Sequence, residues 1–76
     1  MNISYEPYSP IDDTGAIGRY TITGANNEYN ALVSLLNSYG YFVEEPTFLL
    51  NYGSIRVYDI LEKNRLDQLF ATLRGE

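Results

Sequence analysis

Residues 27–41 read NEYNALVSLLNSYGY, and this stretch decides the fold. Its apolar side chains recur three and four positions apart, which places them on one face of a helix. They are Tyr29, Leu32, Val33 and Leu36. The spacing predicts a helix from about Asn27 to Tyr39, and the side chains of the Asn26-Asn27 pair predict its N-cap. Gly40 then predicts a left-handed end, after which Tyr41 folds back on Leu36 in a Schellman motif.

Two stretches before this helix predict extended structure. Residues 17–23 are rich in β-branched and aromatic types, which favour a strand. Residues 1–15 contain several turn formers and predict an extended arm and a loop. Within the arm, Ile3 and Tyr5 alternate with polar neighbours, so a short edge strand is allowed there until Pro7 ends it.

Strand patterns resume after the helix. Residues 41–45 predict a strand that Pro46 ends or bulges, because proline cannot donate to a ladder. Residues 47–50 and 55–58 predict the two strands of a hairpin, and the Asn and Gly within residues 51–54 predict its turn.

A second stripe of apolar residues at helical spacing predicts the last helix. The stripe consists of Leu66, Leu69, Phe70 and Leu73. Gly75 follows the expected end of the helix. Asp59 and Asn64 each begin a capping box, since an acidic residue stands three positions after each. We choose the second box, because residues 57–60 suit the end of a strand.

Together these elements predict one α+β domain over residues 1–76. Both helices and the strands have one apolar face, which favours an antiparallel sheet of three to four strands with two helices packed on one face (β-α-β-β-β-α). Helix, three strands and helix is also the element order of a double-stranded RNA-binding domain. That family holds phosphates with a basic cluster at the start of its second helix, where this chain offers only Lys63 and Arg65 beside two acidic residues. We therefore do not predict RNA binding.

The composition excludes several kinds of chemistry. The 76 residues include neither His nor Cys, so the usual general base, the thiolate nucleophile and the common zinc ligands are absent. Asp12-Asp13 lacks the rest of a calcium-binding EF-hand loop, and adjacent Glu44-Glu45 would point to opposite faces of a strand. We predict no catalytic, cofactor-binding or metal-binding residues, and a carboxylate-based enzyme is kept only as an alternative.

The expected location is the cytoplasm. The absence of cysteine removes the disulfides on which small secreted domains rely. No apolar run approaches the roughly 20 residues of a membrane span, and the N-terminus lacks the basic and apolar segments of a signal peptide.

The negative charge is concentrated in the first part of the chain. The net charge is −5, and residues 1–55 hold six acidic residues and one arginine, whereas residues 56–76 hold four residues of each sign. A negative field repels phosphate backbones, so we expect a basic protein partner rather than direct nucleic-acid binding. Solubility is the alternative explanation of such a charge.

Eight tyrosines are more than the core of so small a domain can bury, because each buried hydroxyl needs a hydrogen-bond partner. We expect several of them on the surface, where Tyr beside Asn and Ser is typical of protein contacts. Shielding of edge strands by these rings is the alternative. Tyrosines and acidic residues together predict a partner-binding surface made of Tyr5, Tyr8, Asp12, Asp13, Glu28, Tyr41, Glu44, Glu45 and Tyr52.

In its size, acidity, lack of cysteine and abundance of Tyr and Asn, the chain resembles the small phage-encoded proteins that block bacterial defence, anti-CRISPR proteins among them. The resemblance implies a stoichiometric inhibitor whose acidic, Tyr-rich surface covers a basic nucleic-acid-binding surface of a CRISPR effector or another host defence complex. A structural or self-assembling subunit that uses an exposed sheet edge is the alternative. Monomer and homodimer both stay open.

Overall fold

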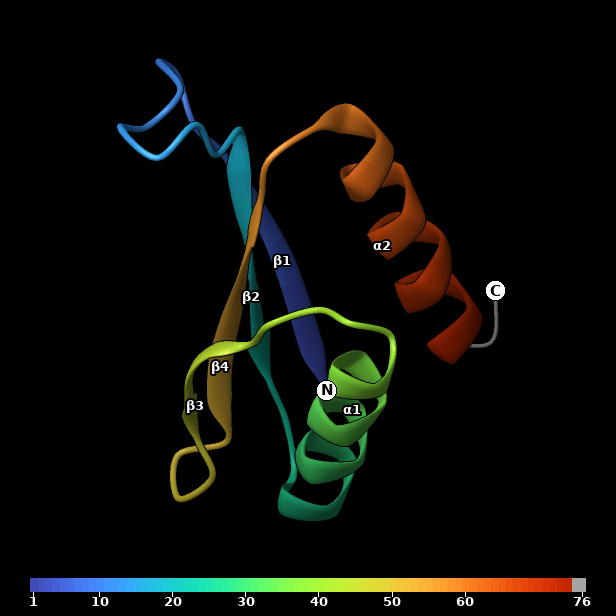
Figure 1. Ribbon diagram of the computed structural model, residues 1–76. Helices are drawn as coiled ribbons and strands as arrows, with labels where there is room; N and C mark the ends of the chain where they lie inside the picture. The colour runs from blue at the N-terminus through green and yellow to red at the C-terminus, as the bar shows by residue number, and fades with distance from the viewer. Residues whose placement is uncertain (75–76) are drawn as a thin grey trace.

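The computed structural model describes residues 1–74 as a four-stranded antiparallel sheet with two helices on one side (Figure 1). The elements in chain order are β1 (Asn2–Pro7), β2 (Gly18–Thr23), α1 (Asn26–Ser38), β3 (Glu44–Thr47), β4 (Tyr52–Val57) and α2 (Ile60–Leu73). The strand order across the sheet is β1-β2-β4-β3, so β1 and β3 are its two edges. The predicted α+β class, with its antiparallel sheet and one helical side, is confirmed.

The order along the chain differs from the prediction by one strand. Two strands precede α1 and two follow it. The additional early strand is β1, the short edge strand that the sequence allowed, and it pairs with β2 from Asn2 opposite Thr23 to Pro7 opposite Gly18. Only β3 and β4 lie between the helices, so the element order of a double-stranded RNA-binding domain is not present.

The core lies between the sheet and the helices. β2 alternates as predicted, with Tyr20 and Ile22 buried on the helical side. The half-buried residues on the open side are Arg19, Thr21 and Thr23. Each helix contributes its apolar stripe. The buried cluster consists of Tyr20, Ile22, Tyr29, Leu32, Val33, Leu36, Val43, Ile55, Val57, Leu66 and Phe70.

The C-terminal end of α1 is a Schellman motif, as predicted. Gly40 adopts a φ of 89°, a left-handed conformation that glycine adopts without strain. The Tyr41 N–H donates to the Leu36 carbonyl at 3.0 Å, and the Gly40 N–H donates to the Asn37 carbonyl at 3.1 Å. This arrangement ends the helix and directs the chain toward β3.

Both predicted N-caps are wrong. The N-cap of α1 is Ala25, whose methyl side chain cannot accept a hydrogen bond, and the Asn27 side chain accepts from the backbone N–H of Glu28. The N-cap of α2 is Asp59, whose carboxylate accepts from the Glu62 N–H at 2.6 Å. The first capping box is therefore the one used, because β4 ends before this residue. Gly75, expected to follow α2, lies outside the described residues.

The hairpin between β3 and β4 is displaced from the predicted one. Its turn, residues 48–51, occupies most of the predicted strand at residues 47–50, and most of the predicted turn at residues 51–54 belongs to β4. Gly53 is a strand residue, and a Cβ at this position would lie only 2.5 Å from the hydroxyl oxygen of Tyr29. The glycine lets this buried ring pack directly on the strand.

β3 is short and irregular. Of the predicted strand at residues 41–45, only the last two residues belong to it. Its register with β4 shifts between Glu44 and Thr47, and Glu45 adopts a φ of 51°. The irregularity includes Pro46, where the sequence predicted that the strand would end or bulge.

Candidate protein-contact surface

The turn between β3 and β4 exposes three consecutive apolar side chains. Phe48, Leu49 and Leu50 are 52, 90 and 73% exposed. Asn51 ends the turn with a φ of 53°, a left-handed conformation that Asn adopts more readily than most residues. We call Phe48, Leu49 and Leu50 the contact tip.

One aromatic contact fixes the contact tip to the core. The Phe48 ring meets the Tyr29 ring edge-on, with the two centroids 5.9 Å apart. Tyr29 is fully buried, and burial raises the pKa of its phenol. Its hydroxyl donates to the Tyr52 carbonyl at 2.5 Å. A helix residue and a strand residue thus hold the base of the turn, and Leu49 and Leu50 project from it.

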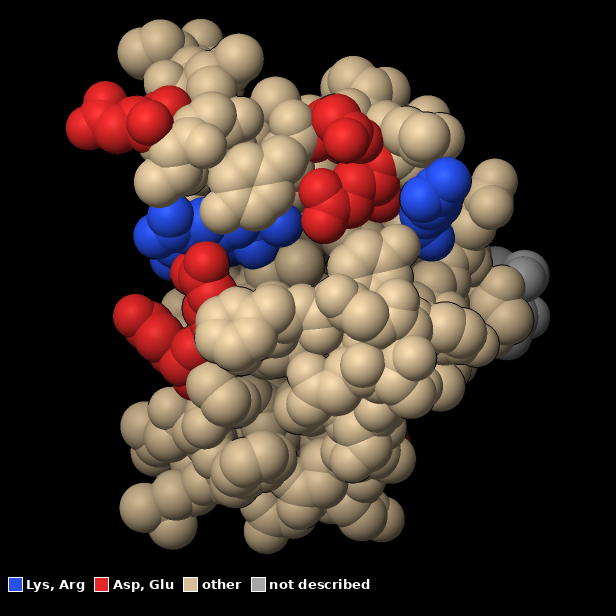
Figure 2. Space-filling view, viewed as in Figure 1, with Lys and Arg blue, Asp and Glu red and all other residues tan. Residues whose placement is uncertain are grey.

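The helix that packs on the contact tip has a largely uncharged outward face. The outward face of α1 carries Asn30, Ser34 and Asn37, all of them exposed. In Figure 2 no described residue over the lowest part of the face in view is coloured as charged. Charged groups of both signs gather over its middle and upper parts, and acidic groups reach below mid-height on the left. An exposed apolar patch with polar residues at its rim is typical of a site that another molecule covers.

Charged side chains cross the open side of the sheet. Arg19 in β2 lies directly opposite Arg56 in β4. Glu44 in β3 bridges them, with carboxylate oxygens 3.5 Å from Nη2 of Arg19 and 3.1 Å from Nε of Arg56. The Glu44 carboxylate also raises the pKa of the Arg56 guanidinium. Part of the charge of Glu44, a predicted partner-binding residue, is therefore neutralised within the fold.

Asp12, another predicted partner-binding residue, organises a turn. Its Oδ1 accepts from the Thr14 N–H at 2.9 Å, the Thr14 hydroxyl at 2.6 Å and the Ala16 N–H at 3.1 Å. The bond from the Thr14 side chain, with these backbone bonds, holds the pKa of Asp12 below its ordinary value. The Asp12-Asp13 pair thus begins a turn in which a carboxylate satisfies the local backbone.

The predicted tyrosines are half-buried and belong to different parts of the fold. They are Tyr5, Tyr8, Tyr41 and Tyr52. The Tyr5 ring packs against Tyr20 with the centroids 4.8 Å apart, and the Lys63 ammonium lies 4.9 Å from the centroid of Tyr5. The same ring covers Gly18 on the neighbouring strand. For Tyr5, the geometry favours the alternative in which the ring shields an edge strand.

The structure brings together only some of the predicted residues. Asp12 and Glu44 are linked through Arg56, which contacts Glu44 and whose Nη1 lies 3.4 Å from the Thr14 hydroxyl. Glu28 lies elsewhere, at the start of α1, 3.5 Å from the N-terminal ammonium. The predicted set is therefore distributed over several elements.

The contact tip is not predicted by the sequence pattern. The pattern favours a strand over residues 47–50, in which alternate side chains would be buried. The available signal was the position of Leu49 and Leu50 in a short apolar run between two turn-forming residues, Pro46 and Asn51.

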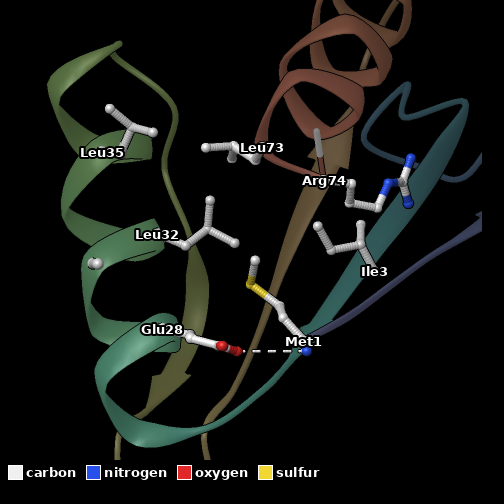
Figure 3. A pocket seen from close by; sticks show the side chains of 8 residues that line it. Met1, Ile3, Glu28, Leu32, Leu35, Leu73 and Arg74 are labelled. Carbon is white, nitrogen blue, oxygen red and sulfur yellow. Dashed lines mark ion pairs between the residues drawn. The ribbon is translucent and has the colours of Figure 1, made fainter. Parts of the chain in front are cut away.

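A groove of about 410 Å³ opens between α1, the end of α2 and the start of β1 (Figure 3). Leu32 and Leu35 line it from α1, and Leu73 lines it from α2. Figure 3 shows the Glu28 carboxylate directed at the Met1 ammonium beside these leucines. The groove offers apolar contact and one ion pair. Across residues 1–74, no three acidic side chains come together as metal ligands.

Comparison of the chain with protein families, with curated proteins and with solved structures finds no match. Neither helix, within the described part of the chain, is long and apolar enough to cross a membrane. Function therefore has to be inferred from the surface geometry of the chain.

Proposed function

We propose that this chain is a non-enzymatic protein-binding domain, acting in the cytoplasm, that docks through the contact tip. The observation that carries the proposal is the 90% exposure of Leu49 in a turn that is fixed to the core. Fully burying one leucine side chain is worth roughly 1.5–3 kcal/mol, so three adjacent apolar side chains are a large source of binding energy.

The chemistry of the contact tip favours a partner with an apolar cleft. Leu49 and Leu50 would enter the cleft as anchors. Phe48 already packs on Tyr29, so docking would restrict little additional motion of the Phe48 side chain. The uncharged polar side chains of α1 would form hydrogen bonds at the rim, as is typical of protein interfaces.

A narrower form of this proposal is that the chain inhibits a nucleic-acid-handling complex, as the sequence predicts. Two observations support it: the net charge of −5, and the exposure of Asp13 and Glu45, which make no ion pair among the described residues. Glu45 lies just before the contact tip, so basic groups around an apolar cleft would complement both features.

Reversal of these two charges tests the inhibitor form. The variants Asp13→Lys and Glu45→Lys leave Asp12 and Glu44 in place, which are bonded within the fold. Both variants should slow association with a basic complex, and the effect should shrink as salt is raised. Association rates that both reversals leave unchanged at low salt would contradict the electrostatic form and leave the contact tip as the basis of binding.

A quantitative pull-down from an extract of the source organism tests the contact tip itself. The double variant Leu49→Ser/Leu50→Ser should recover about tenfold less of the partner than the wild-type chain, because anchor residues dominate interface energies. The matched control is Phe42→Ser, which changes a 76% exposed apolar residue outside the tip and should recover the wild-type amount. Circular dichroism should show the same folded state for both variants.

Two outcomes would overturn the proposal. One is equal recovery of the partner by the tip variant and the wild-type chain. The other is binding of the wild-type chain to phosphatidylcholine vesicles that the tip variant has lost, since the contact tip would then enter lipid rather than a protein cleft.

A further inference from the structure

The two edges of the sheet differ in how well they could accept another strand. β3 has four residues, a shifted register, Pro46 and a left-handed Glu45, all of which hinder strand addition. β1 pairs with β2 over six residues without any shift. Among residues 1–74, no strand lies along its other side. A regular edge with free backbone groups is a template for a further strand.

The backbone groups on the free side of β1 follow from its hydrogen-bond pattern. The Tyr8 N–H donates to the Ile17 carbonyl at 2.9 Å, one residue beyond the strand and in the same register. Because hydrogen-bonded pairs alternate along antiparallel strands, every second residue before Tyr8 also bonds to β2. Ile3 and Tyr5 lie between those residues and direct their N–H and C=O groups outward. Pro7 occupies the next outward position, where β2 requires no donor.

We propose that β1 pairs antiparallel with β1 of a second copy of this chain, about a two-fold axis at Ser4. In this register Ile3 stands opposite the partner's Tyr5, and their outward N–H and C=O groups bond reciprocally. Both side chains already pack against the core, so apolar side chains meet on the helical side. On the open side Asn2 meets the partner's Glu6, which keeps the two Glu6 carboxylates apart.

A second copy fits this edge better than a flexible peptide does. β1 is already extended and paired with β2, so its pairing with another β1 orders no additional chain. The opposite edge, β3, is too irregular to take part, so assembly ends at a closed dimer and does not continue as a filament. The dimer would place its two contact tips at the outer edges of one continuous sheet.

Sedimentation velocity over a range of concentrations tests the dimer. About 0.15 M salt limits the repulsion between two copies of net charge −5. Ile3→Pro removes an outward N–H without removing a donor to β2. It should weaken dimerisation about tenfold relative to Ile3→Ala, which controls for the lost side chain. A wild-type chain that stays monomeric up to about 1 mM, or equal dimerisation of the two variants, would overturn the proposal.

Charge at the two-fold axis tests the register. Ser4 is exposed, so Ser4→Glu and Ser4→Lys should leave the monomer folded. Each variant alone sets like charges against each other and should dimerise about threefold more weakly at low salt. An equimolar mixture should restore dimers that contain one copy of each variant. Failure of the mixture to restore them would overturn the proposed register. Neither variant alters the contact tip, so dimerisation and partner binding are measured separately.

Discussion

Beside each edge strand of the sheet, a tyrosine lies on a glycine of the neighbouring inner strand. At the β3 edge Tyr29 of α1 lies on Gly53 of β4, and at the β1 edge Tyr5 lies on Gly18 of β2. Tyr29 is fully buried, whereas Tyr5 is half-buried and belongs to the edge strand itself. The β3 edge is therefore tied into the core, and contacts nearer the surface hold the β1 edge.

The two edges also differ in which elements supply their charged contacts. At the β3 edge Glu44 bridges two arginines of the inner strands. On the β1 side of the sheet the contacts come from α2, where Lys63 lies over the Tyr5 ring of β1 and Asp67 accepts a hydrogen bond from the Tyr20 hydroxyl of β2. One edge thus supports an anchored apolar turn, and the other leaves regular backbone groups free for pairing.

The largest expected effect comes from adding one methyl group under each tyrosine. At Gly53 a Cβ would lie 2.5 Å from the Tyr29 hydroxyl oxygen and 2.7 Å from Cγ1 of Val43, and both side chains are buried. We expect Gly53→Ala to lower the free energy of unfolding by about 2–3 kcal/mol, measured by urea denaturation. At Gly18 the Cβ would meet the outer end of the half-buried Tyr5 ring, which can move toward solvent. Gly18→Ala should therefore cost about 1 kcal/mol.

A third variant makes this test specific. In Gly18→Ala/Tyr5→Ala the ring that meets the new methyl group is gone, so the added cost of Gly18→Ala should disappear in the Tyr5→Ala background. If Gly18→Ala lowers the free energy of unfolding as much as Gly53→Ala does, Tyr5 is held as tightly as Tyr29. The proposed difference between the two edges would then be wrong.

The next effect concerns the ion pairs of the β3 edge. Glu44→Gln would leave Arg19 and Arg56 facing each other without their shared carboxylate. Because these side chains are about three-quarters buried, we expect a loss of about 0.5–1 kcal/mol in the free energy of unfolding, smaller in high salt. The control is Glu45→Gln, which changes the exposed neighbour and should cost close to nothing. Equal losses for the two variants would show that the ion pairs do not hold this edge.

The helices and the sheet could be predicted because their residues follow local rules. The stripe that begins at Tyr29 repeats at helical spacing, and the Gly40 end depends on backbone preferences of a few neighbouring residues. The hairpin could not be placed by such rules, because Gly53 is a turn former by composition. Its actual role, to accept the Tyr29 ring, depends on a contact between distant parts of the chain.

The candidate site was less predictable for the same reason. Leu49 and Leu50 suit a buried strand by composition, and their exposure follows from where β4 begins. Glu44 and Asp12 were expected to face a partner because they are acidic, but acidity alone does not show which carboxylates bond within the fold. Cross-strand neighbours such as Arg19 and Arg56 are known only once the register is known.

The smallest effect is a sensitivity to acid of the contacts between α2 and the β1 side of the sheet. The Asp67 carboxylate accepts hydrogen bonds from the Lys63 ammonium, at 2.7 Å, and from the Tyr20 hydroxyl. Burial acts to raise the pKa of Asp67, but these bonds outweigh it and hold the pKa below its ordinary value. Because the folded pKa is lowered, the stabilisation is complete above the unfolded value of about 4 and is lost as the pH falls through the folded pKa.

Asp67→Asn should therefore destabilise the chain at pH 7 and have a smaller effect at pH 2, measured by thermal unfolding. The Asp67 side chain is 46% exposed, so we expect well below about 1 kcal/mol at pH 7. In a Lys63→Met background the difference between the two pH values should shrink, since the charged donor is gone. A loss that is equal at both pH values would mean that packing, and not charge, holds α2 on this side of the sheet. The two edges would then be held by the same kind of contact, and the greater openness of β1 would rest on its regular backbone alone.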